Sequence, residues 1–386
     1  MNPLLNTAKL HRRNLHQIPE LSFQEFKTTR YIREHLDALS IPYFTPLETA
    51  TLVFFKGQST EDDTIAFRGD IDALPIKEET GLAYASTHEG VMHACGHDGH
   101  TSILLTFAQW CKEQQDQGLL EKNILLIFQP SEETNAGADA VIQAFPFKDY
   151  HVKQIFGIHL GPDLPEHTLA TRSGFFMASA TEYQVSFKGL SAHVAQKEKG
   201  QSALGAVNHI VSQFSQVQHY FLNGLHQNIL HIGSMSAGEA PNTVASDGFI
   251  NGTIRTYNPD DLDRMTEKMQ RIVNQADSLF GTTSTLNLFK GYPAVHNDPK
   301  LVPVVKESAE AAGLKVQELD EPYLFGEDFS FYSKIAQTNF SFLGVRNEEK
   351  GYRHGLHTSR FNFDEDCLLD GIHYFQSLAK SLGAVR

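Results

Sequence analysis

The sequence predicts an α/β fold with a mixed, mainly parallel sheet, into which a smaller α+β domain is inserted. Near both ends of the chain, short apolar runs that stop at polar residues or proline alternate with helical patterns, as in a parallel sheet covered on both faces. Between these parts, strands of alternating hydrophobicity and two helices form a separate unit. We therefore expect a discontinuous larger domain of residues 1–177 and 291–386 and an inserted domain of residues 178–290.

Length, charge and cysteine content limit the class of protein. The 386 residues are about two to three times the commonest domain length, which favours two domains. A formal charge of −14 disfavours a nucleic-acid partner, because such partners require clustered Lys and Arg. The absence of an apolar leader or of a long apolar window predicts a soluble, cytoplasmic protein without a membrane partner. Three scattered cysteines are too few for a disulfide framework and fit a reducing compartment.

The first part of the chain combines helical patterns with apolar runs. One helical pattern covers residues 7–39 and is interrupted near Pro19. A second helix is expected from Asp98, as its N-cap, to about Gln117, with Gly118 where a C-cap belongs. The expected strands lie at residues 51–57, 63–75, 123–130 and 154–161.

The pattern changes at about Ala178. TEYQVSFKG alternates as a half-buried strand does, and it begins a strand–helix–strand–strand–helix–strand order. The two helices of this unit are expected over residues 201–221 and 259–280. After about Pro293 the α/β pattern returns with a helix over residues 299–313, the strand NFSFLGV and a terminal helix.

The segment GVMHACGHDGHTSILL holds three histidines, one cysteine and one aspartate within eight positions, His93 to His100. Cys95 and His97 are two residues apart, so a turn can bring both side chains to one region. Zinc accepts thiolate sulfur and imidazole nitrogen, but two ligands do not make a site. At this point a metal site and a buried polar helix start are both open.

Further candidate ligands follow the expected strands, where parallel sheets carry functional residues. Glu132 and Glu133 come after an apolar strand, so one carboxylate can bind a metal while the other takes a proton. His159 ends another strand, and His354 and His357 lie in a late loop. Taken singly, the pair could be a solvated acidic turn and each histidine a structural residue. Together with the earlier Cys–His pair they favour a metal site.

Six segments carry a family resemblance. RGDIDALPIKEE, VMHACGHDGHT, IFQPSEETNAGA, FGIHLG, GTIRT and GEDFSFY occur in this order. Over the whole chain the sequence resembles the dimetal amidohydrolases related to aminoacylases and zinc carboxypeptidases. Within them it is most similar to hippurate hydrolases, indole-acetyl-amino-acid hydrolases and N-acetyl-diaminopimelate deacetylases. The resemblance implies a zinc-peptidase-like catalytic domain, an inserted lid that often dimerises, and two divalent cations. Zinc or manganese is expected, with cobalt or nickel as alternatives.

The resemblance also implies roles for residues of the larger domain. Glu132 matches the general base, and Asp70 would support a ligand through a hydrogen bond. Cys95 stands where the family places a ligand that can bridge the two metals. The implied metal ligands are Cys95, His97, Glu133, His159 and His357.

In the inserted domain the resemblance implies contacts to the substrate. His193 matches a histidine that steadies the oxyanion, in some relatives from a neighbouring subunit. Asn242 and Arg255 match positions that hold the amide and the free carboxylate of the substrate, although Arg255 could equally form a strand-end salt bridge. Glu327, in the part of the chain assigned to the larger domain, matches a site residue without a defined role. Glu198 replaces the second histidine of the family pattern, so it would disfavour acidic substrate groups and favour an amine.

The activity implied is metal-dependent hydrolysis of the amide bond in N-acyl amino acids, with Glu132 as the base and a homodimer formed through the lid. A dipeptidase or carboxypeptidase of the same fold is an alternative, and so is a non-catalytic protein that binds metal or peptide. A cysteine hydrolase with Cys95 as nucleophile and His97 as base is a further alternative. This last reading explains neither the Glu132–Glu133 pair nor His159.

Overall fold

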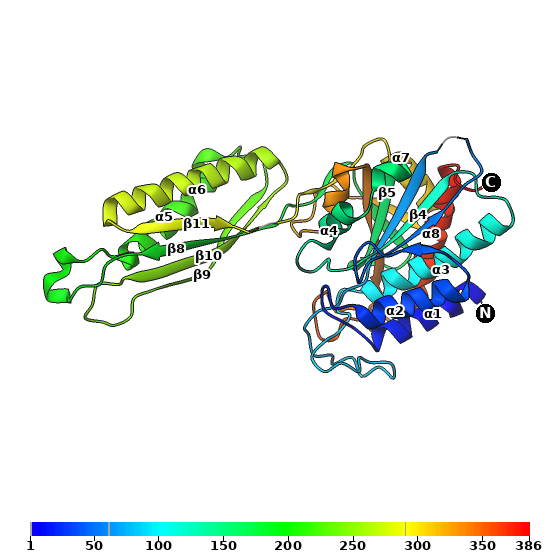
Figure 1. Cartoon of the computed structure of the whole chain (residues 1–386), viewed down its shortest axis with the longest axis horizontal. Coiled ribbons are helices and arrows are strands. Elements are labelled where there is room, and N and C mark those ends of the chain that lie inside the picture. The colour runs from blue at the N-terminus through cyan, green and yellow to red at the C-terminus, as the bar shows by residue number, and fades with distance from the viewer. Residues whose placement is uncertain (1, 61, 290) are drawn as a thin grey trace. The chain divides into compact units, whose positions relative to one another are not determined.

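The computed structural model describes residues 2–60, 62–289 and 291–386 of the chain. By its internal contacts the chain divides into two units, whose elements are labelled in Figure 1. The first unit comprises Met1–Phe176, His296–Pro322 and Asp328–Arg386, and the second comprises Met177–Val295 and Tyr323–Glu327. The domain boundary expected at residue 290 lies outside the described residues.

The first unit contains an eight-stranded sheet and most of the helices. Its α-helices are α1 (Pro3–His16), α2 (Phe26–Ala38), α3 (His97–Asp116), α4 (Gly137–Ala144), α7 (Val302–Ala311) and α8 (Cys367–Ser381). Its 3-10 helices are η1 (Phe147–Tyr150) and η3 (Asp328–Lys334). The strands of the sheet are β1 (Tyr43–Phe44), β2 (Thr51–Phe55), β3 (Thr64–Asp70), β4 (Asn123–Gln129), β5 (Val152–Pro165), β6 (Thr168–Thr171), β13 (Lys315–Glu318) and β14 (Gln337–Arg346). β7 (Gly174–Met177) and β12 (Val295–Asn297) form a separate two-stranded sheet.

The large sheet has the strand order β1-β2-β4-β3-β5-β14-β6-β13. Its central strands β4, β3, β5 and β14 are parallel, whereas β2 and β6 run antiparallel to their central neighbours β4 and β14. The expected mixed, mainly parallel sheet is therefore confirmed. In its register Asp70 lies opposite Gln129, so β3 and β4 end together and deliver the residues that follow them to one edge.

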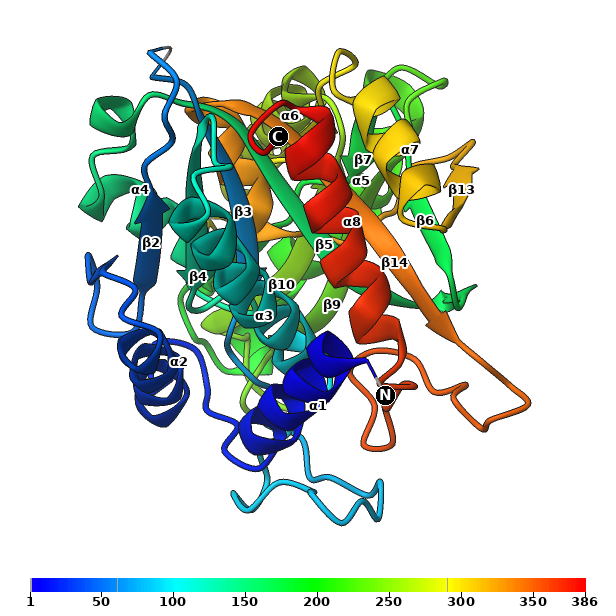
Figure 2. The same ribbon diagram turned by 90° about the vertical axis from the view of Figure 1, so that its right-hand side faces the viewer.

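Helices cover both faces of this sheet. Figure 2 shows α3 and α8 side by side over one face. Successive residues of β5 point to opposite faces: a side chain added at Gly157 would come within 2.9 Å of Phe329 in η3, whereas Ile158 reaches Gly371 in α8. Because both faces are buried, the central strands read as continuous apolar runs rather than as alternating ones.

Two expected helix starts differ in the structure. The pattern at residues 7–39 is interrupted around Pro19 as expected, but the first of its two helices, α1, begins at Pro3. Asp98 is not the N-cap of α3, so that expectation was wrong: the N-cap is Gly96, at φ 84°. The left-handed conformation favours glycine at this position, and a side chain here would also come within 3.0 Å of Leu160. The C-cap of α3 is Gln117, and Gly118, at φ 69°, is the left-handed residue that directly follows it.

The second unit is a four-stranded antiparallel sheet with two helices. Its elements are β8 (Thr181–Lys188), η2 (Val194–Lys199), α5 (Ala203–Phe221), β9 (Asn228–Ala237), β10 (Asp247–Thr256), α6 (Pro259–Phe280) and β11 (Thr283–Leu288). The strand order is β11-β8-β10-β9, and α5 and α6 lie over the same face (Figure 1). Alternate residues of β8, Tyr183, Val185 and Phe187, are buried in the core beneath these helices.

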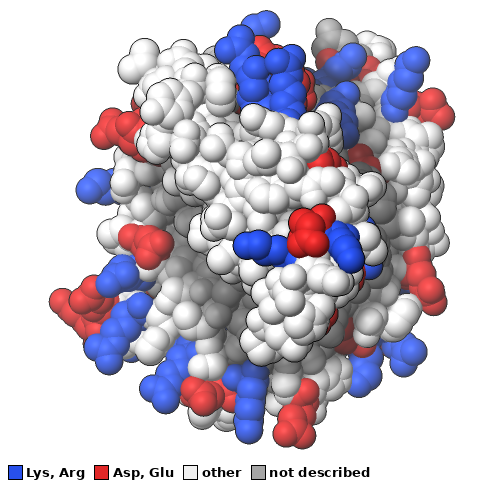
Figure 3. All heavy atoms as spheres, turned by 90° about the vertical axis from the view of Figure 1, so that its left-hand side faces the viewer, with Lys and Arg blue, Asp and Glu red and all other residues white. Residues whose placement is uncertain are grey.

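The charges on one face of the chain and the character of the described helices bear on possible partners. On the face of the chain seen in Figure 3, Lys and Arg are interspersed with Asp and Glu. No helix in the described part of the chain combines the length and the apolar character that a membrane crossing requires.

Candidate metal centre

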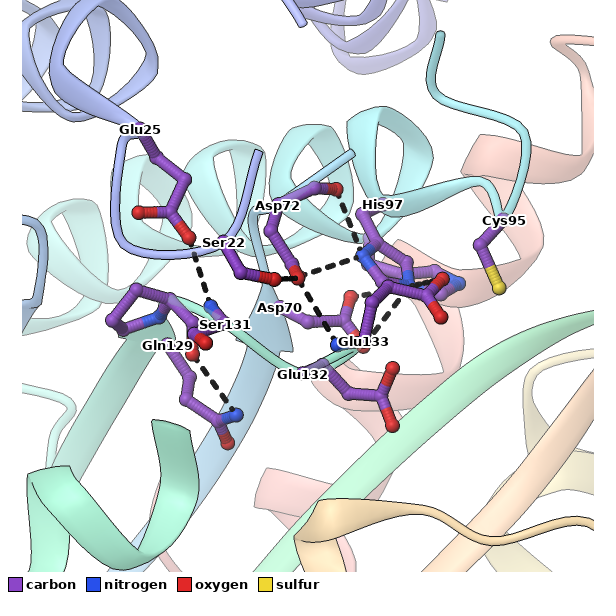
Figure 4. Close-up of polar contacts among 12 residues, drawn as sticks. Ser22, Glu25, Asp70, Asp72, Cys95, His97, Gln129, Ser131, Glu132 and Glu133 are labelled. Carbon is purple, nitrogen blue, oxygen red and sulfur yellow. Dashed lines mark hydrogen bonds and ion pairs between the residues drawn. The ribbon is translucent and has the colours of Figure 1, made fainter. Parts of the chain in front are cut away.

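The six residues expected as metal ligands or general base come together in the first unit from segments far apart in sequence. Cys95 and His97 flank the start of α3, Glu132 and Glu133 follow β4, His159 lies within β5, and His357 lies in the loop before α8. Figure 4 shows that Cys95, His97, Glu132 and Glu133 surround a common space. The fold thus brings together residues separated by more than 200 positions.

Their donor atoms form overlapping groups. Those of Cys95, His97 and His159 lie within 4.8 Å of one another, and so do those of Cys95, Glu133 and His357. The Cys95 sulfur is 3.3 Å from Nε2 of His159. Oε1 of Glu133 is 3.3 Å from Nε2 of His357 and 3.8 Å from Nε2 of His97. Cys95 belongs to both groups.

Polar atoms at the centre that lack a hydrogen bond fit a metal ion. Nδ1 of His97 faces the backbone carbonyl of Asp72 at 3.0 Å and its carboxylate at 3.1 Å, so Nε2 is the nitrogen that faces the centre. Both this Nε2 and Oε1 of Glu133 are buried atoms, and among the described residues neither makes a hydrogen bond of regular geometry, although Oε1 lies 3.3 Å from Nε2 of His357. Buried polar atoms without partners are costly, and metal coordination would satisfy both.

The charges at the centre also call for cations. Burial, followed by Glu133 and Glu132, raises the pKa of the Cys95 thiol well above its usual value. Burial alone would lower the pKa of His97, but Asp70 and Asp72 raise it to about 10. Burial and the neighbouring carboxylates thus hold a proton on Cys95, and the carboxylates hold one on His97. Divalent cations would neutralise these groups and displace the protons.

Two aspartates behind the centre have different partners. Asp72 accepts from His97 through Oδ1, and its Oδ2 accepts the backbone N–H of Glu133 at 3.0 Å and the hydroxyl of Ser22 at 2.8 Å (Figure 4). Asp70, expected to support a ligand, lies 3.7 Å from Nε2 of His97 and bonds His100 instead. No role was predicted for Asp72 from the sequence. The signal was its spacing: in an extended RGDID segment, Asp70 and Asp72 point to the same side.

His100 also lies near donor atoms, but both of its nitrogens are engaged. Its Nδ1 donates to Asp70 at 2.5 Å, and its Nε2 accepts the backbone N–H of Leu160 at 2.9 Å. Leu160 follows His159, so His100 fixes the backbone beside a candidate ligand. It has no free lone pair for a metal.

The carboxylate of Glu132 is placed next to a buried ionic network. The backbone N–H of Asp328 lies 3.4 Å from Oε1 of Glu132. The side chain of Asp328 accepts from Arg68 at 2.9 Å and from Gln129 at 2.9 Å, and Arg68 also donates to Asp70 at 2.6 Å. This network ties the ends of β3 and β4 to η3, beside the Glu132–Glu133 pair.

His354 lies apart from the centre. It lines a hollow of about 230 Å³ together with Lys350, Tyr352 and Arg360. Of the two late histidines, His357 is therefore the one whose donor atom lies with the other candidate ligands.

The candidate substrate residues of the inserted domain all lie in the second unit. His193 is exposed at the start of η2, and its Nδ1 accepts the backbone N–H of Ala195 at 3.1 Å. Asn242 lies beside it, since its carbonyl accepts the N–H of Val194 at 3.0 Å. Glu198 is exposed on the same 3-10 helix.

Arg255 lies on β10 next to the segment that contains Glu327. A side chain added at Gly326 would come within 3.2 Å of its guanidinium. Burial lowers the pKa of Arg255, although Glu182 and Tyr292 act in the opposite direction. A partly buried guanidinium can bind a carboxylate through two hydrogen bonds.

Comparisons with known proteins point to one family. Residues 66–381 match the model of peptidase family M20/M25/M40. An uncharacterized hydrolase of Staphylococcus haemolyticus is 48% identical over 374 residues, which are 97% of each chain. A dinuclear metal-binding peptidase of the M20 family from Bacillus subtilis is 30% identical, with a TM-score of 0.84 over 99% of this chain and 98% of that one. The aminobenzoyl-glutamate utilization protein of Klebsiella pneumoniae shares the fold, with 20% identity and a TM-score of 0.71 over 97% and 95% of the two chains.

Proposed function

Because the chain belongs to peptidase family M20/M25/M40, whose members are metal-dependent hydrolases, we propose that it cleaves the amide bond of N-acyl amino acids. The observation that carries this proposal is the convergence of sulfur, imidazole and carboxylate donors beside Glu132, a carboxylate that could act as a base. A site that only bound metal would have no use for such a base. A cysteine nucleophile would leave Glu133 and His159 unexplained.

Different residues of the chain would bind the metals and transfer the proton. Cys95, His97, Glu133, His159 and His357 would hold two divalent cations, with zinc or manganese the best match to this mixed donor set. When bound, the cations polarise the scissile carbonyl and acidify a water molecule. Glu132 takes the proton of the attacking water and passes it to the leaving nitrogen.

The second unit would supply the contacts that select the substrate. We assign the oxyanion to His193, the amide to Asn242 and the free carboxylate to Arg255. We also propose that the enzyme is a cytoplasmic homodimer assembled through this unit. The three free cysteines are compatible with a reducing compartment.

The test combines metal analysis with a substrate panel of N-acetyl, N-benzoyl and dipeptide compounds. Glu132→Gln should keep two metals per chain and lose about 100-fold or more in kcat. The matched control is Glu113→Gln, a replacement of an exposed glutamate on α3, which should change neither.

Three results would overturn the proposal. Fully active enzyme without bound metal, or activity that survives a chelator and is lost to a thiol reagent, would favour the cysteine mechanism. Turnover of dipeptides far above that of acylated amino acids would replace the substrate class while keeping the chemistry.

A further inference from the structure

Glu25 is a fully buried carboxylate that reaches the loop carrying Glu132 from a distant segment. It lies between α1 and α2, with 0% of its surface exposed. Its Oε1 accepts two backbone N–H groups, those of Phe23 and Ser131, each at 2.9 Å (Figure 4 shows the bond to Ser131). Its other oxygen has no hydrogen-bond partner among the described residues. The carboxylate thus binds backbone N–H groups and forms no ion pair among the described residues.

The loop that it holds has an unfavourable backbone. After β4 ends at Gln129, Ser131 adopts φ 58°, and Asn135 and Ala136 adopt φ 64° and 54°. Non-glycine residues avoid this left-handed region, and such conformations persist only where the surroundings enforce them. Ser131 directly precedes Glu132. Its conformation therefore sets the direction in which the base leaves the strand.

Separate contacts fix the two glutamates of this loop. The backbone N–H of Glu133 is held by Asp72, which also orients the ring of His97. The residue before Glu132 is held by Glu25. One buried carboxylate therefore supports the ligand side of the loop and another supports the side of the base.

We propose that Glu25 is a positioning residue for catalysis, whose carboxylate holds Ser131 in its left-handed conformation and thereby aims Glu132 at the attacking water. This inference rests on the proposed function of Glu132 as the general base. It predicts a loss in the chemical step without a loss of metal or of substrate binding.

The acceptor oxygen, rather than the charge, is the required feature. Glu25→Gln keeps an oxygen where Oε1 accepts from Ser131, whereas Glu25→Ala removes it. Burial and the neighbouring Asp72 raise the pKa of Glu25 to about 7, so a neutral side chain suits this environment. The conservative variant should therefore rescue the function.

Glu20 offers a matched control in the same segment. Its Oε2 accepts the backbone N–H groups of Lys27 at 2.7 Å and Thr28 at 3.0 Å, at the first turn of α2. It makes the same kind of bond as Glu25 but to a helix terminus. Glu20→Ala should lower the melting temperature and leave kcat within about twofold of the wild type.

The experiment measures kcat, KM and metal content of the full-length, metal-loaded enzyme on N-acetyl amino acids. Glu25→Ala should lower kcat about 10- to 100-fold, with KM and two bound metals unchanged, because small misplacements of a catalytic group cost this much. Glu25→Gln should stay within about threefold of the wild type. In the double variant Glu25→Ala/Glu132→Gln, the first change should add no further loss, because it acts through Glu132.

A suppressor provides an independent check. Glycine tolerates positive φ, so Ser131→Gly should restore part of the kcat lost in Glu25→Ala. If Glu25→Ala does not fold, Glu25→Asp replaces it, since the shorter side chain withdraws the same acceptor.

Outcomes separate this inference from the proposed function. A kcat for Glu25→Ala or Glu25→Asp equal to that of Glu20→Ala overturns the positioning role. So does loss of metal, or a further loss in the double variant. A fully active Glu132→Gln enzyme overturns the proposed function itself.

Discussion

Replacing Asp72 by alanine would remove three supports of the metal centre in one step. Asp72 accepts from Nδ1 of His97 at 3.1 Å, from the backbone N–H of Glu133 at 3.0 Å and from Ser22 at 2.8 Å. The first contact helps to orient the ring of His97, although Nδ1 also lies 3.0 Å from the backbone carbonyl of Asp72, which the alanine variant keeps. The second fixes the backbone of another candidate ligand. We therefore expect metal binding to weaken while the base, Glu132, stays in place.

The contacts set the size of the effect. Loss of the partner that orients a ligating histidine weakens metal binding about 10- to 100-fold, or about 1.4 to 2.7 kcal/mol. The buried N–H of Glu133 loses its acceptor as well, which lowers the unfolding free energy by about 1 to 3 kcal/mol. Ser22→Ala removes only the third contact of Asp72, so its effect on metal binding should be several-fold smaller.

The assay is a competition between the enzyme and a coloured chelator, followed by kinetics at saturating metal. Asp72→Ala should show the higher dissociation constant and, once saturated, a kcat within about fivefold of the wild type. An unchanged dissociation constant would mean that the carboxylate of Asp72 does not orient His97, and that the backbone carbonyl of this residue suffices. A kcat that stays low at saturating metal would assign Asp72 to the chemical step instead.

Three further changes probe other parts of the chain. Burial alone would lower the pKa of His16, but Asp98 and Glu78 raise it to about 9. The stabilisation from protonated His16 is therefore complete below about pH 6.5 and is lost as the pH rises through about 9. In urea titrations, His16→Gln should lower the unfolding free energy by up to about 3 kcal/mol at pH 6 and by much less at pH 9.5. His193→Ala should lower kcat about 100- to 1000-fold without changing the metal content, and a smaller loss would remove the residue from the oxyanion site. Glu198→Ala should lower the ratio of turnover on basic over acidic acyl-amino acids about threefold to tenfold, and an unchanged ratio would show that this exposed carboxylate does not select the substrate.

The sheet could be predicted from the sequence because strands buried on both faces appear as continuous apolar runs. The run NILLIFQ is the buried strand β4, and Pro130 and Ser131 separate it from the polar pair Glu132 and Glu133. Short-range patterns of this kind predicted the mainly parallel sheet, and the alignment of strand ends then gathers the candidate ligands. The roles of these ligands, in contrast, came from a resemblance of motifs, since no local pattern reveals which distant groups share a cation.

Long-range contacts explain where the sequence misled. Asp98 has the chemistry of an N-cap and stands at a helix start, yet it accepts from Arg12 at 3.3 Å and from His16 at 2.8 Å, both on α1. Nothing near Asp98 in sequence announces these partners. The helix can begin without its side chain because Gly96 adopts the left-handed conformation.

The loop SEETNA shows why distant carboxylates surround the base. Its left-handed residues Ser131, Asn135 and Ala136 include no glycine, so the conformation is not intrinsic to the loop and must be imposed from outside. Glu25 and Asp72 impose it through backbone N–H groups, and neither residue needs to touch a substrate to do so. A glycine at Ser131 would relax the strain but would also free the backbone next to Glu132. The buried carboxylates thus hold the strained backbone in a single conformation and thereby fix the direction of the Glu132 side chain, which a flexible turn could not do.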